Sequence, residues 1–393
     1  MKEKKIFALV LGGYVNGYSI IKELFEMGVQ NIILFDDHRS LGSFSNKIDR
    51  FERIKNDPDG LKSAILNLRK DCDYIVVYPT NDLHLENLSA LHSELVDFCH
   101  LPFNQKNIIS SLDKNVQYSY CEKHNVPYPK TKYITSTEEL DLIEDLLFPL
   151  IMKPSKRYPL SVGVFRNILI KDVKDLNRQK DLINSFLNKG IVFIVSEYIP
   201  GDDVNIYAYV GYRSDNGKIL NEWIGKKLTQ HPDNFGVFSS ASNTSSDIVR
   251  EQGRKLMEVM DLHGICEPEF KYDPRDEKFK LMEINLRSMM WHRLGNASGV
   301  HLQYTQYLDA IGEQVKKEKQ NLNGDTHFVY MKHEISNIIF RRKYWKHFKE
   351  NVFGAKHRYF AIYDKEDLKP FFYDFIGLSK ALIRRCQRVL KGN

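Results

Sequence analysis

The sequence has few of the features that mark secreted, membrane-spanning or thiolate-metal proteins. Its five cysteines are odd in number, widely spaced and never arranged as a CxxC pair. This distribution excludes a disulfide framework and a cysteine zinc site, and it favours reduced thiols in the cytoplasm. No apolar run reaches the length of a membrane span, and the first apolar segment is too short for a secretory signal. We therefore expect a cytoplasmic protein.

Signatures of hydrolases and of repeat proteins are missing as well. The thirteen histidines form no HExxH pair, and no Ser–His–Asp or Cys–His arrangement stands out. What remains is an ordinary folded composition, with 42% hydrophobic residues, 27% charged residues and a net charge of +6. A chain of 393 residues with this composition has room for two or three packed units.

Residues 1–108 alternate strand and helix patterns. The run KIFALVLG leads into Gly12, Gly13 and Gly17, a helical pattern follows, and NIILFDD and DYIVVYPTND supply further strands. This alternation is typical of an open parallel sheet. The glycine spacing is not GxGxxG, so the turn favours a structural or substrate-binding role over dinucleotide binding. We predict an N-terminal α/β domain.

Residues 109–312 form the next region. DKNVQYSYCEKH predicts a helix that ends at a proline-containing connector. Two apolar strands in PLIMKPSKRYPLSVGVFRNILIKD flank a polar loop, and IVFIVSEYIPGDDVNIYAYVGYR predicts a buried strand, a bend and a second strand. A helix near YTQYLDAIGEQV closes the region.

The most informative stretch is residues 267–293. The alternating runs CEPEFKYD and FKLMEINLR flank PRDEK, and this pattern predicts a β-hairpin. Side chains two apart share a face of a strand, which places Glu283, Asn285 and Arg287 together, and the first strand adds Glu269. Carboxylate and amide oxygens suit Mg²⁺, and an arginine suits a phosphate oxygen. The alternative is a solvated face with paired charges, but the apolar residues between these positions argue against it.

These motifs resemble the ATP-grasp superfamily of carboxylate–amine and carboxylate–thiol ligases. The resemblance covers roughly residues 1–312 and is strongest at EFKYD and MEINLR, where the step from Glu269 to Glu283 is similar to that in the carbamoyl-phosphate synthetase large chain. It implies an α/β protein with a Rossmann-like pre-ATP-grasp domain at 1–108 and an ATP-grasp domain at 109–312. Within the latter it implies a small lid subdomain at about 130–197 and an α+β core, and it leaves residues 313–393 as a C-terminal extension.

The resemblance also implies roles for single residues. Glu269, Glu283 and Asn285 would hold Mg²⁺, with Mn²⁺ as the other suitable ion, and Arg287 would stabilise an acyl phosphate. The residues implied for ATP are Lys114 and Lys153 at the phosphates, Ser161 and Gly163 in the loop over them, Glu197, Tyr198 and Ile199 at the adenine, and Asp203 or its neighbour Asp202 at the ribose.

Two further segments bear on the site. The lid loop KPSKRYPLSVGV is poorer in glycine than is usual in the family, so either it is stiffer or Lys156 and Arg157 replace backbone contacts with charge. The segment EWIGKKLTQHPDNFGVFSSAS resembles one in the subgroup that includes D-aspartate ligase. It suggests Lys226, Lys227 and Gln230 as contacts to a substrate carboxylate or the γ-phosphate, with the two lysines as catalytic candidates. The alternative is an exposed basic turn.

The implied function is that of an ATP- and Mg²⁺-dependent ligase that activates a small carboxylate as an acyl phosphate and joins it to an amine. The substrates considered are amino acids, including D-amino acids for peptidoglycan, and a uronic acid of a surface or capsule polysaccharide. A ligase with a thiol or peptide-amine nucleophile is another enzyme hypothesis. A non-catalytic nucleotide-binding regulatory protein is the alternative from a different class, although the complete hairpin set argues against it.

Residues from about 313 leave the family pattern. RRKYWKHFKE and PFFYDFIGLSKALIRRCQRVLKGN combine apolar and basic residues, and the second predicts an amphipathic basic helix. We rank packing on the main body first and contact with the inner membrane surface second. Nucleic-acid binding ranks last because no recognition motif accompanies the charge, and we expect no nucleic-acid partner. An oligomer is left open. We also expect Trp291 in the core and His292 at a substrate.

Overall fold

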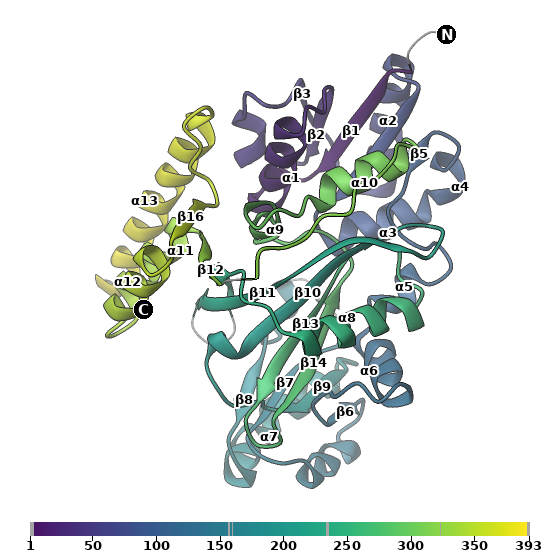
Figure 1. The fold of residues 1–393 in the computed structure, drawn as a ribbon. Helices are drawn as coiled ribbons and strands as arrows, with labels where there is room; N and C mark the ends of the chain where they lie inside the picture. The colour runs from purple at the N-terminus through teal and green to yellow at the C-terminus, as the bar shows by residue number, and fades with distance from the viewer. Residues whose placement is uncertain (1–3, 156–157, 159, 233–235, 323, 391–393) are drawn as a thin grey trace. The chain divides into compact units, whose positions relative to one another are not determined.

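A computed structural model describes the backbone of residues 4–390, apart from residues 156–157, 159, 233–235 and 323. Side chains are described as far as Ser379, with Leu160 excepted. The chain divides into two compact units (Figure 1). The first comprises Met1–Tyr120, Asp202–Phe270 and Glu283–Asn393, and the second comprises Cys121–Gly201 and Lys271–Met282. The domain limits expected from the sequence remain a prediction.

The first unit contains a five-stranded parallel sheet with the strand order β3-β2-β1-β4-β5. Helix α1 covers it with Ile20, Ile21 and Leu24, which pack on Val10 and Leu34. The predicted alternation of strands and helices is therefore confirmed. The elements of this part are β1 (Ile6–Leu11), α1 (Val15–Glu26), β2 (Ile32–Asp36), β3 (Arg50–Arg53), α2 (Pro58–Leu68), β4 (Tyr74–Pro79), α3 (Asp82–Ala90), α4 (His92–Leu95), β5 (Cys99–His100), α5 (Ile108–Ser111) and α6 (Lys114–Lys123).

The glycine-rich turn after β1 has a structural explanation. Gly12 has φ of +81°, and a Cβ there would lie 2.5 Å from the hydroxyl of Thr80. A Cβ on Gly17 would lie 1.9 Å from the carbonyl oxygen of Gly12. Both positions need glycine because the turn and the start of α1 pack against each other and against the loop after β4.

A seven-stranded sheet has the order β14-β13-β10-β11-β12-β15-β16, and it belongs to the first unit except at residues 271–282 of its hairpin. The predicted hairpin is present as β13 and β14, and Trp291 is buried against Trp223 in the core, as expected. The elements are β10 (Ile206–Arg213), β11 (Ile219–His231), β12 (Val237–Ser242), α8 (Asp247–Val259), β13 (Gly264–Asp273), β14 (Lys278–Asn285), α9 (Arg293–Ala297), α10 (Leu302–Ala310) and β15 (Thr326–Val329).

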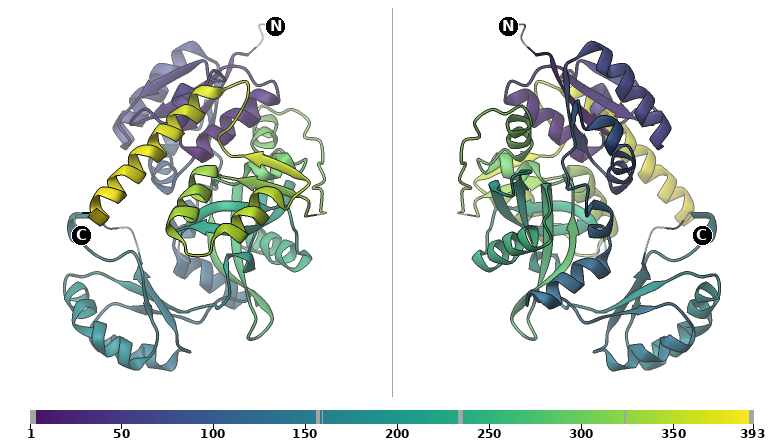
Figure 2. Two further views of the ribbon diagram at one scale, coloured as in Figure 1. Left: turned by 90° about the vertical axis from the view of Figure 1, so that its left-hand side faces the viewer. Right: turned by 90° about the vertical axis from the view of Figure 1, so that its right-hand side faces the viewer.

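The C-terminal extension is part of this unit. Its strand β16 (His357–Phe360) extends the seven-stranded sheet beside β15, and helices α11 (Met331–Phe340), α12 (Trp345–Phe353) and α13 (Leu368–Leu390) surround it. In Figure 2, left, α13 is the yellow helix that crosses the N-terminal part of the chain. Tyr373 of α13 stacks on Phe44 with ring centroids 4.5 Å apart, so the beginning of α13 packs on the body of the protein.

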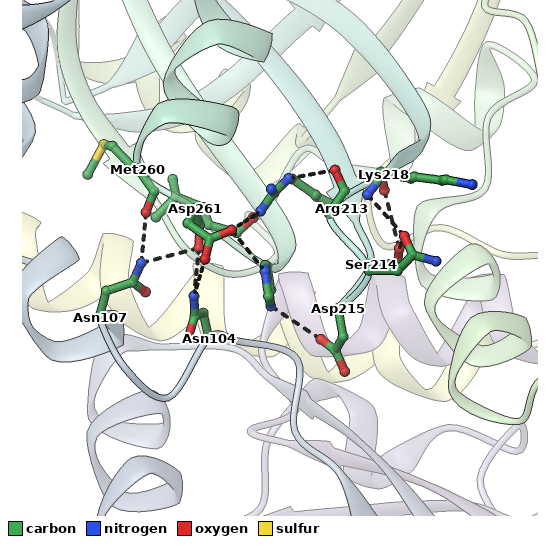
Figure 3. A network of polar contacts seen from close by, with 12 residues as sticks. Asn104, Asn107, Arg213, Ser214, Asp215, Lys218, Met260 and Asp261 are labelled. Atoms are coloured by element: carbon green, nitrogen blue, oxygen red, sulfur yellow. Dashed lines mark hydrogen bonds and ion pairs between the residues drawn. The ribbon is translucent and has the colours of Figure 1, made fainter.

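A polar network joins the N-terminal part of this unit to the seven-stranded sheet (Figure 3). Arg213 at the end of β10 donates to Asp261 at 2.7 Å, and Asn104 donates to the same carboxylate at 2.8 Å. Asn107 donates to the carbonyl of Met260 at 2.7 Å. Because Asp261 accepts from both sides, the turn after α8 fixes the segment that leads into α5.

The second unit contains a four-stranded antiparallel sheet with the order β6-β9-β7-β8. Helix α7 contributes Leu176, Ile183 and Phe186 to its core. The two strands predicted around the polar loop are present as β7 and β8. The elements are β6 (Thr131–Ile134), β7 (Leu150–Pro154), β8 (Ile168–Ile170), α7 (Val173–Leu187) and β9 (Phe193–Glu197).

Candidate active site

A buried ion pair lies at the centre of the candidate site. Lys227 of β11 donates to the Oε2 atom of Glu269 on β13 at 2.5 Å, and the two side chains are 9% and 10% exposed. Burial alone would lower the pKa of Lys227, but the carboxylates of Glu269, Glu267 and Glu283 outweigh it and raise that pKa. The sheet therefore brings three carboxylates within electrostatic reach of one charged lysine.

Burial raises the pKa of Glu269, Lys227 opposes this, and the charges of Glu283 and Glu267 add to the rise. The cluster is thus short of positive charge, and a cation would stabilise it.

Glu267 was not among the residues singled out from the sequence. Its side chain is fully buried, it accepts from the amide of Asn285 at 3.2 Å, and it lies 2.5 Å from the Nε2 atom of His292. Asn285 is therefore positioned by a carboxylate that is two residues from Glu269 on β13. The signal in the sequence was the alternation itself, since Glu267 and Glu269 share a face.

The second acidic position of the hairpin is more open. Lys114, the first residue of α6, donates to Glu283 at 2.6 Å, and the two side chains are 21% and 40% exposed. Gln117 donates to the carbonyl of Ile284 at 3.2 Å and accepts from its N–H at 3.0 Å. These bonds fix the end of β14 against α6, so two sequence-predicted residues 169 positions apart lie together.

Arg287 follows β14 and lies against the parallel sheet. Its Nε atom donates to Asp82 at 2.7 Å, at the start of α3, and its side chain is 10% exposed. Asn16 of α1 bridges the carbonyls of Thr80 and Ser288 at 2.7 and 3.3 Å. The loops after β1 and β4 therefore meet the segment that carries Arg287. This is the edge where open parallel sheets bind ligands, and sequence reasoning missed Asp82 there.

The other predicted residues of the first unit have different surroundings. Lys226 lies over the ring of Tyr207 at 5.4 Å, and neighbouring side chains of a strand point to opposite faces, so it does not share the face of Lys227. The buried carboxylate of Asp203 accepts from the N–H of Gln230 at 2.8 Å. The roles of Lys226 and Asp203 remain predictions.

In the second unit, local hydrogen bonds hold the segment that the sequence predicts at adenine. Glu197 ends β9 and accepts from the N–H of Leu147 at 3.0 Å, the N–H of Tyr198 donates to Pro149 at 2.9 Å, and Ile199 is buried. A pocket of about 590 Å³ in this unit is lined by Glu197, Leu147 and a group of basic side chains: Lys130, Arg275, Lys278 and Lys280.

The lid loop is described in part. Lys153 lies half-buried on β7, Ser161 is exposed on a short turn, and Gly163 has φ of +69°. Lys156 and Arg157, the proposed basic substitutes for backbone contacts, lie outside the described residues. The phosphate-binding roles of Lys153, Ser161 and Gly163 remain predictions.

The oxygen donors of the hairpin fit a hard divalent cation in kind. Glu269, Glu283 and Asn285 supply two carboxylates and an amide from adjacent strands, and lysines occupy both carboxylates. A tighter set of three donors within 4.8 Å occurs, among the described residues, at Asp36, Asp37 and His38. There Asp36 accepts from the N–H of Gly13 at 2.8 Å and the hydroxyl of Ser40 at 2.6 Å, which explains it as a loop cap.

No protein-family model matches the chain. D-aspartate ligase of Enterococcus faecium (strain Aus0004) is 24% identical over 216 residues, which cover 52% of this chain and 51% of that protein. D-alanine–D-alanine ligase of Anaplasma marginale (strain Florida) is 21% identical over 299 residues, which cover 67% of this chain and 87% of that protein. The solved ADP complex of N5-carboxyaminoimidazole ribonucleotide synthetase matches with a TM-score of 0.63 at 15% identity, over 82% of this chain and 81% of that one.

The chain has the ATP-grasp fold. The expected fold is thereby confirmed, with the parallel sheet before the ATP-grasp region and the hairpin within it. The match spans about half the length of the D-aspartate ligase. No described helix is both long and apolar enough to cross a membrane.

Proposed function

We propose that this ATP-grasp protein is an ATP- and Mg²⁺-dependent carboxylate–amine ligase. The observation that carries the proposal is the convergence of Glu269, Glu283 and Glu267 on Lys227, with Asn285 held beside them. A solvated sheet face would not bury two of these carboxylates, since unpaired buried charge is costly.

Glu269, Glu283 and Asn285 would hold Mg²⁺, which would neutralise phosphate charge when bound. Lys227 and Lys114 hold the two carboxylates in place and present ammonium groups to the same space. An ammonium group is a compact charge suited to phosphate oxygens. Arg287, oriented by Asp82, can donate to the phosphoryl oxygens of an activated carboxylate.

These residues serve a reaction of two steps, and ATP is a substrate of the first step. In the first, a carboxylate oxygen attacks the γ-phosphorus, ADP leaves and an acyl phosphate forms. In the second, an amine attacks the acyl carbon, phosphate leaves, and the nitrogen loses a proton to give an amide. Neither step needs a protein nucleophile, because positioning and charge stabilisation lower the barrier.

The substrate class is inferred from the relatives and the edge of the parallel sheet. Both curated relatives are named for ligation of D-amino acids. We propose an amino acid, a D-amino acid first, as one substrate, with a uronic acid of a surface polysaccharide as the other candidate carboxylate. We propose a role in cell-envelope biosynthesis, in the cytoplasm near the inner membrane surface.

A screen for ADP release tests the proposal. Purified protein is incubated with MgATP and with D- and L-amino acids and nucleotide-linked uronic acids, singly and in pairs. We expect ADP release with one pair, and we expect hydroxylamine to trap a hydroxamate when the carboxylate is supplied without the amine. Release of AMP and pyrophosphate would instead identify an adenylating enzyme and contradict the proposed chemistry.

A further inference from the structure

Residues 341–359 of the C-terminal extension are strongly basic. They contain seven lysines and arginines and one acidic residue, Glu350. This segment includes α12 and the beginning of β16, and none of it belongs to the candidate active site. Its composition needs a separate explanation, because an ordinary solvated surface carries both signs of charge in comparable amounts.

Helix α12 has an inner face that is explained by packing. Tyr344, Phe348 and Val352 are buried and form a small core with Val329 of β15. The buried amide of Asn351 donates to the hydroxyl of Thr229 at 2.9 Å. These contacts account for the attachment of α12 to the sheet, so its other face is not needed for folding.

That outer face is aromatic as well as basic. Trp345 is 54% exposed and Phe353 is 61% exposed, and Lys349 lies between them at helical spacing. The Nζ atom of Lys349 lies 5.6 Å from the ring centroid of Trp345. Lys346 directly follows Trp345, has an 83% exposed side chain, and its Nζ atom lies 3.9 Å from the carboxylate of Glu350. Exposed apolar side chains that gather in one place, with polar residues around them, mark an interaction surface.

The edge strand β16 continues this surface. The guanidinium of Arg358 lies 5.9 Å from the ring of Phe353, and Phe360, on the same face of the strand, packs against the small core of α12. β16 lies at one end of the seven-stranded sheet, and Figure 2, left, shows its arrow beside the C-terminal helices. We call this surface the α12–β16 patch, defined by Trp345, Lys346, Lys349, Phe353 and Arg358.

We propose that the α12–β16 patch docks the protein on an anionic lipid bilayer surface. Lysine and arginine are attracted to acidic headgroups, while tryptophan and tyrosine favour the boundary between headgroups and acyl chains. The rings of Trp345 and Phe353 lie against Phe348, with centroids 5.3 and 6.2 Å away, and both keep more than half of their surface exposed to a bilayer. Proteins that bind single-stranded nucleic acid instead use a positively charged groove that follows the backbone, with aromatic side chains on which the bases stack.

Vesicle sedimentation tests the charge component with the full chain. The protein is spun with phosphatidylcholine vesicles that contain phosphatidylglycerol, and with phosphatidylcholine vesicles alone. We expect binding to the first only, and a steep loss with added salt. In K346E/K349E the partition coefficient should fall by roughly two orders of magnitude or more, since each charge contributes roughly fivefold. The matched control K106E/K255E changes the net charge by the same amount at exposed positions outside the patch. Its partition coefficient should stay within about threefold of the wild-type value.

Tryptophan fluorescence tests insertion. The chain has three tryptophans, and Trp223 and Trp291 are each 1% exposed, so Trp345 is the one accessible to quenchers. On anionic vesicles its emission should shift to the blue and acrylamide quenching should decrease. The variant W345Q should lose this response while unfolding at a similar denaturant concentration.

Three outcomes would overturn the proposal. The first is sedimentation with neither vesicle type. The second is unchanged binding of K346E/K349E together with loss of binding in R384E/R388E, which would place the membrane contact on α13. The third is retention of an RNA oligonucleotide that K346E/K349E abolishes while vesicles never bind, which would identify a nucleic-acid surface.

Discussion

Glu269 and Glu334 are two buried carboxylates that contact β11, at Lys227 and at Thr229, and they are satisfied in different ways. Glu269 is paired with Lys227, a single charge that it shares with two other carboxylates. Glu334 of α11 has no exposure and accepts from the hydroxyls of Thr229, Ser239, Ser240 and Tyr344 and from the amide of Asn351.

The difference indicates two kinds of role. A carboxylate held by one lysine can exchange that lysine for a metal ion or release it toward a phosphate. A carboxylate held by five neutral donors has no group to exchange, and it fixes β11 at Thr229, two residues from Lys227. Glu334 is therefore a positioning residue in the C-terminal extension, while Glu269 belongs to the candidate active site.

The largest effect is expected for Glu334→Ala. The change leaves several buried hydroxyl groups without their acceptor, and we expect a loss of about 3–5 kcal/mol in the free energy of unfolding. Chemical denaturation measures it. Ser239→Ala removes one donor from the same carboxylate and should cost about 1 kcal/mol. If Glu334→Ala unfolded like the wild type, the extension would not hold β11.

Glu283→Ala should differ from Glu334→Ala, because it should change stability little and activity strongly. Its ion pair with Lys114 is partly exposed, so the free energy of unfolding should change by about 1 kcal/mol or less. Mg²⁺-dependent ADP formation should fall at least about a hundredfold, because an oxygen ligand facing the phosphates is lost. Glu258→Ala on the exposed side of α8 is the matched control and should leave turnover unchanged. Near wild-type turnover in Glu283→Ala would refute the metal assignment.

The sequence predicted the local part of this arrangement. Alternation along FKLMEINLR was sufficient to place Glu283 and Asn285 on one face, and the turn in PRDEK was sufficient to predict the hairpin. The parallel sheet also followed from short-range patterns, because each strand and its helix are neighbours in the chain.

The sequence could not show which distant groups complete the site. Asp82 lies 205 residues from Arg287, and Thr229 lies 105 residues from Glu334. A glutamate on a helix normally indicates a solvated face, so Glu334 gave no signal. The pairing of β11 with β12 also shifts register between Lys227 and Thr229, and no periodicity predicts such a bulge.

His333, next to Glu334 on α11, makes the stability of the folded protein depend on pH. Burial lowers the pKa of His333 to about 4, and its Nδ1 atom lies 2.7 Å from the carbonyl of Phe238. Because the pKa in the unfolded chain is about 6.5, the unfolded state binds the proton first and stability falls as the pH drops from about 6.5 toward 4. Between pH 7 and pH 5 this residue should account for about 2 kcal/mol of lost stability. His333→Gln should remove that share of the pH dependence in denaturation curves, and an unchanged slope would contradict the assignment.

The smallest effect is expected for Lys226→Ala, which compares the two faces of β11. Lys226 is half-buried over Tyr207, and the carboxylates lie on the side of Lys227. A partly exposed cation–π contact is worth about 0.5–1 kcal/mol, so unfolding should change by that amount and ADP formation by less than about fivefold. Lys255→Ala, an exposed lysine on α8, is the control for the loss of one positive charge. Steady-state rates with saturating ATP measure the difference. A fall of a hundredfold or more in Lys226→Ala would show that both lysines serve the reaction, and that β11 must present its two faces to substrates.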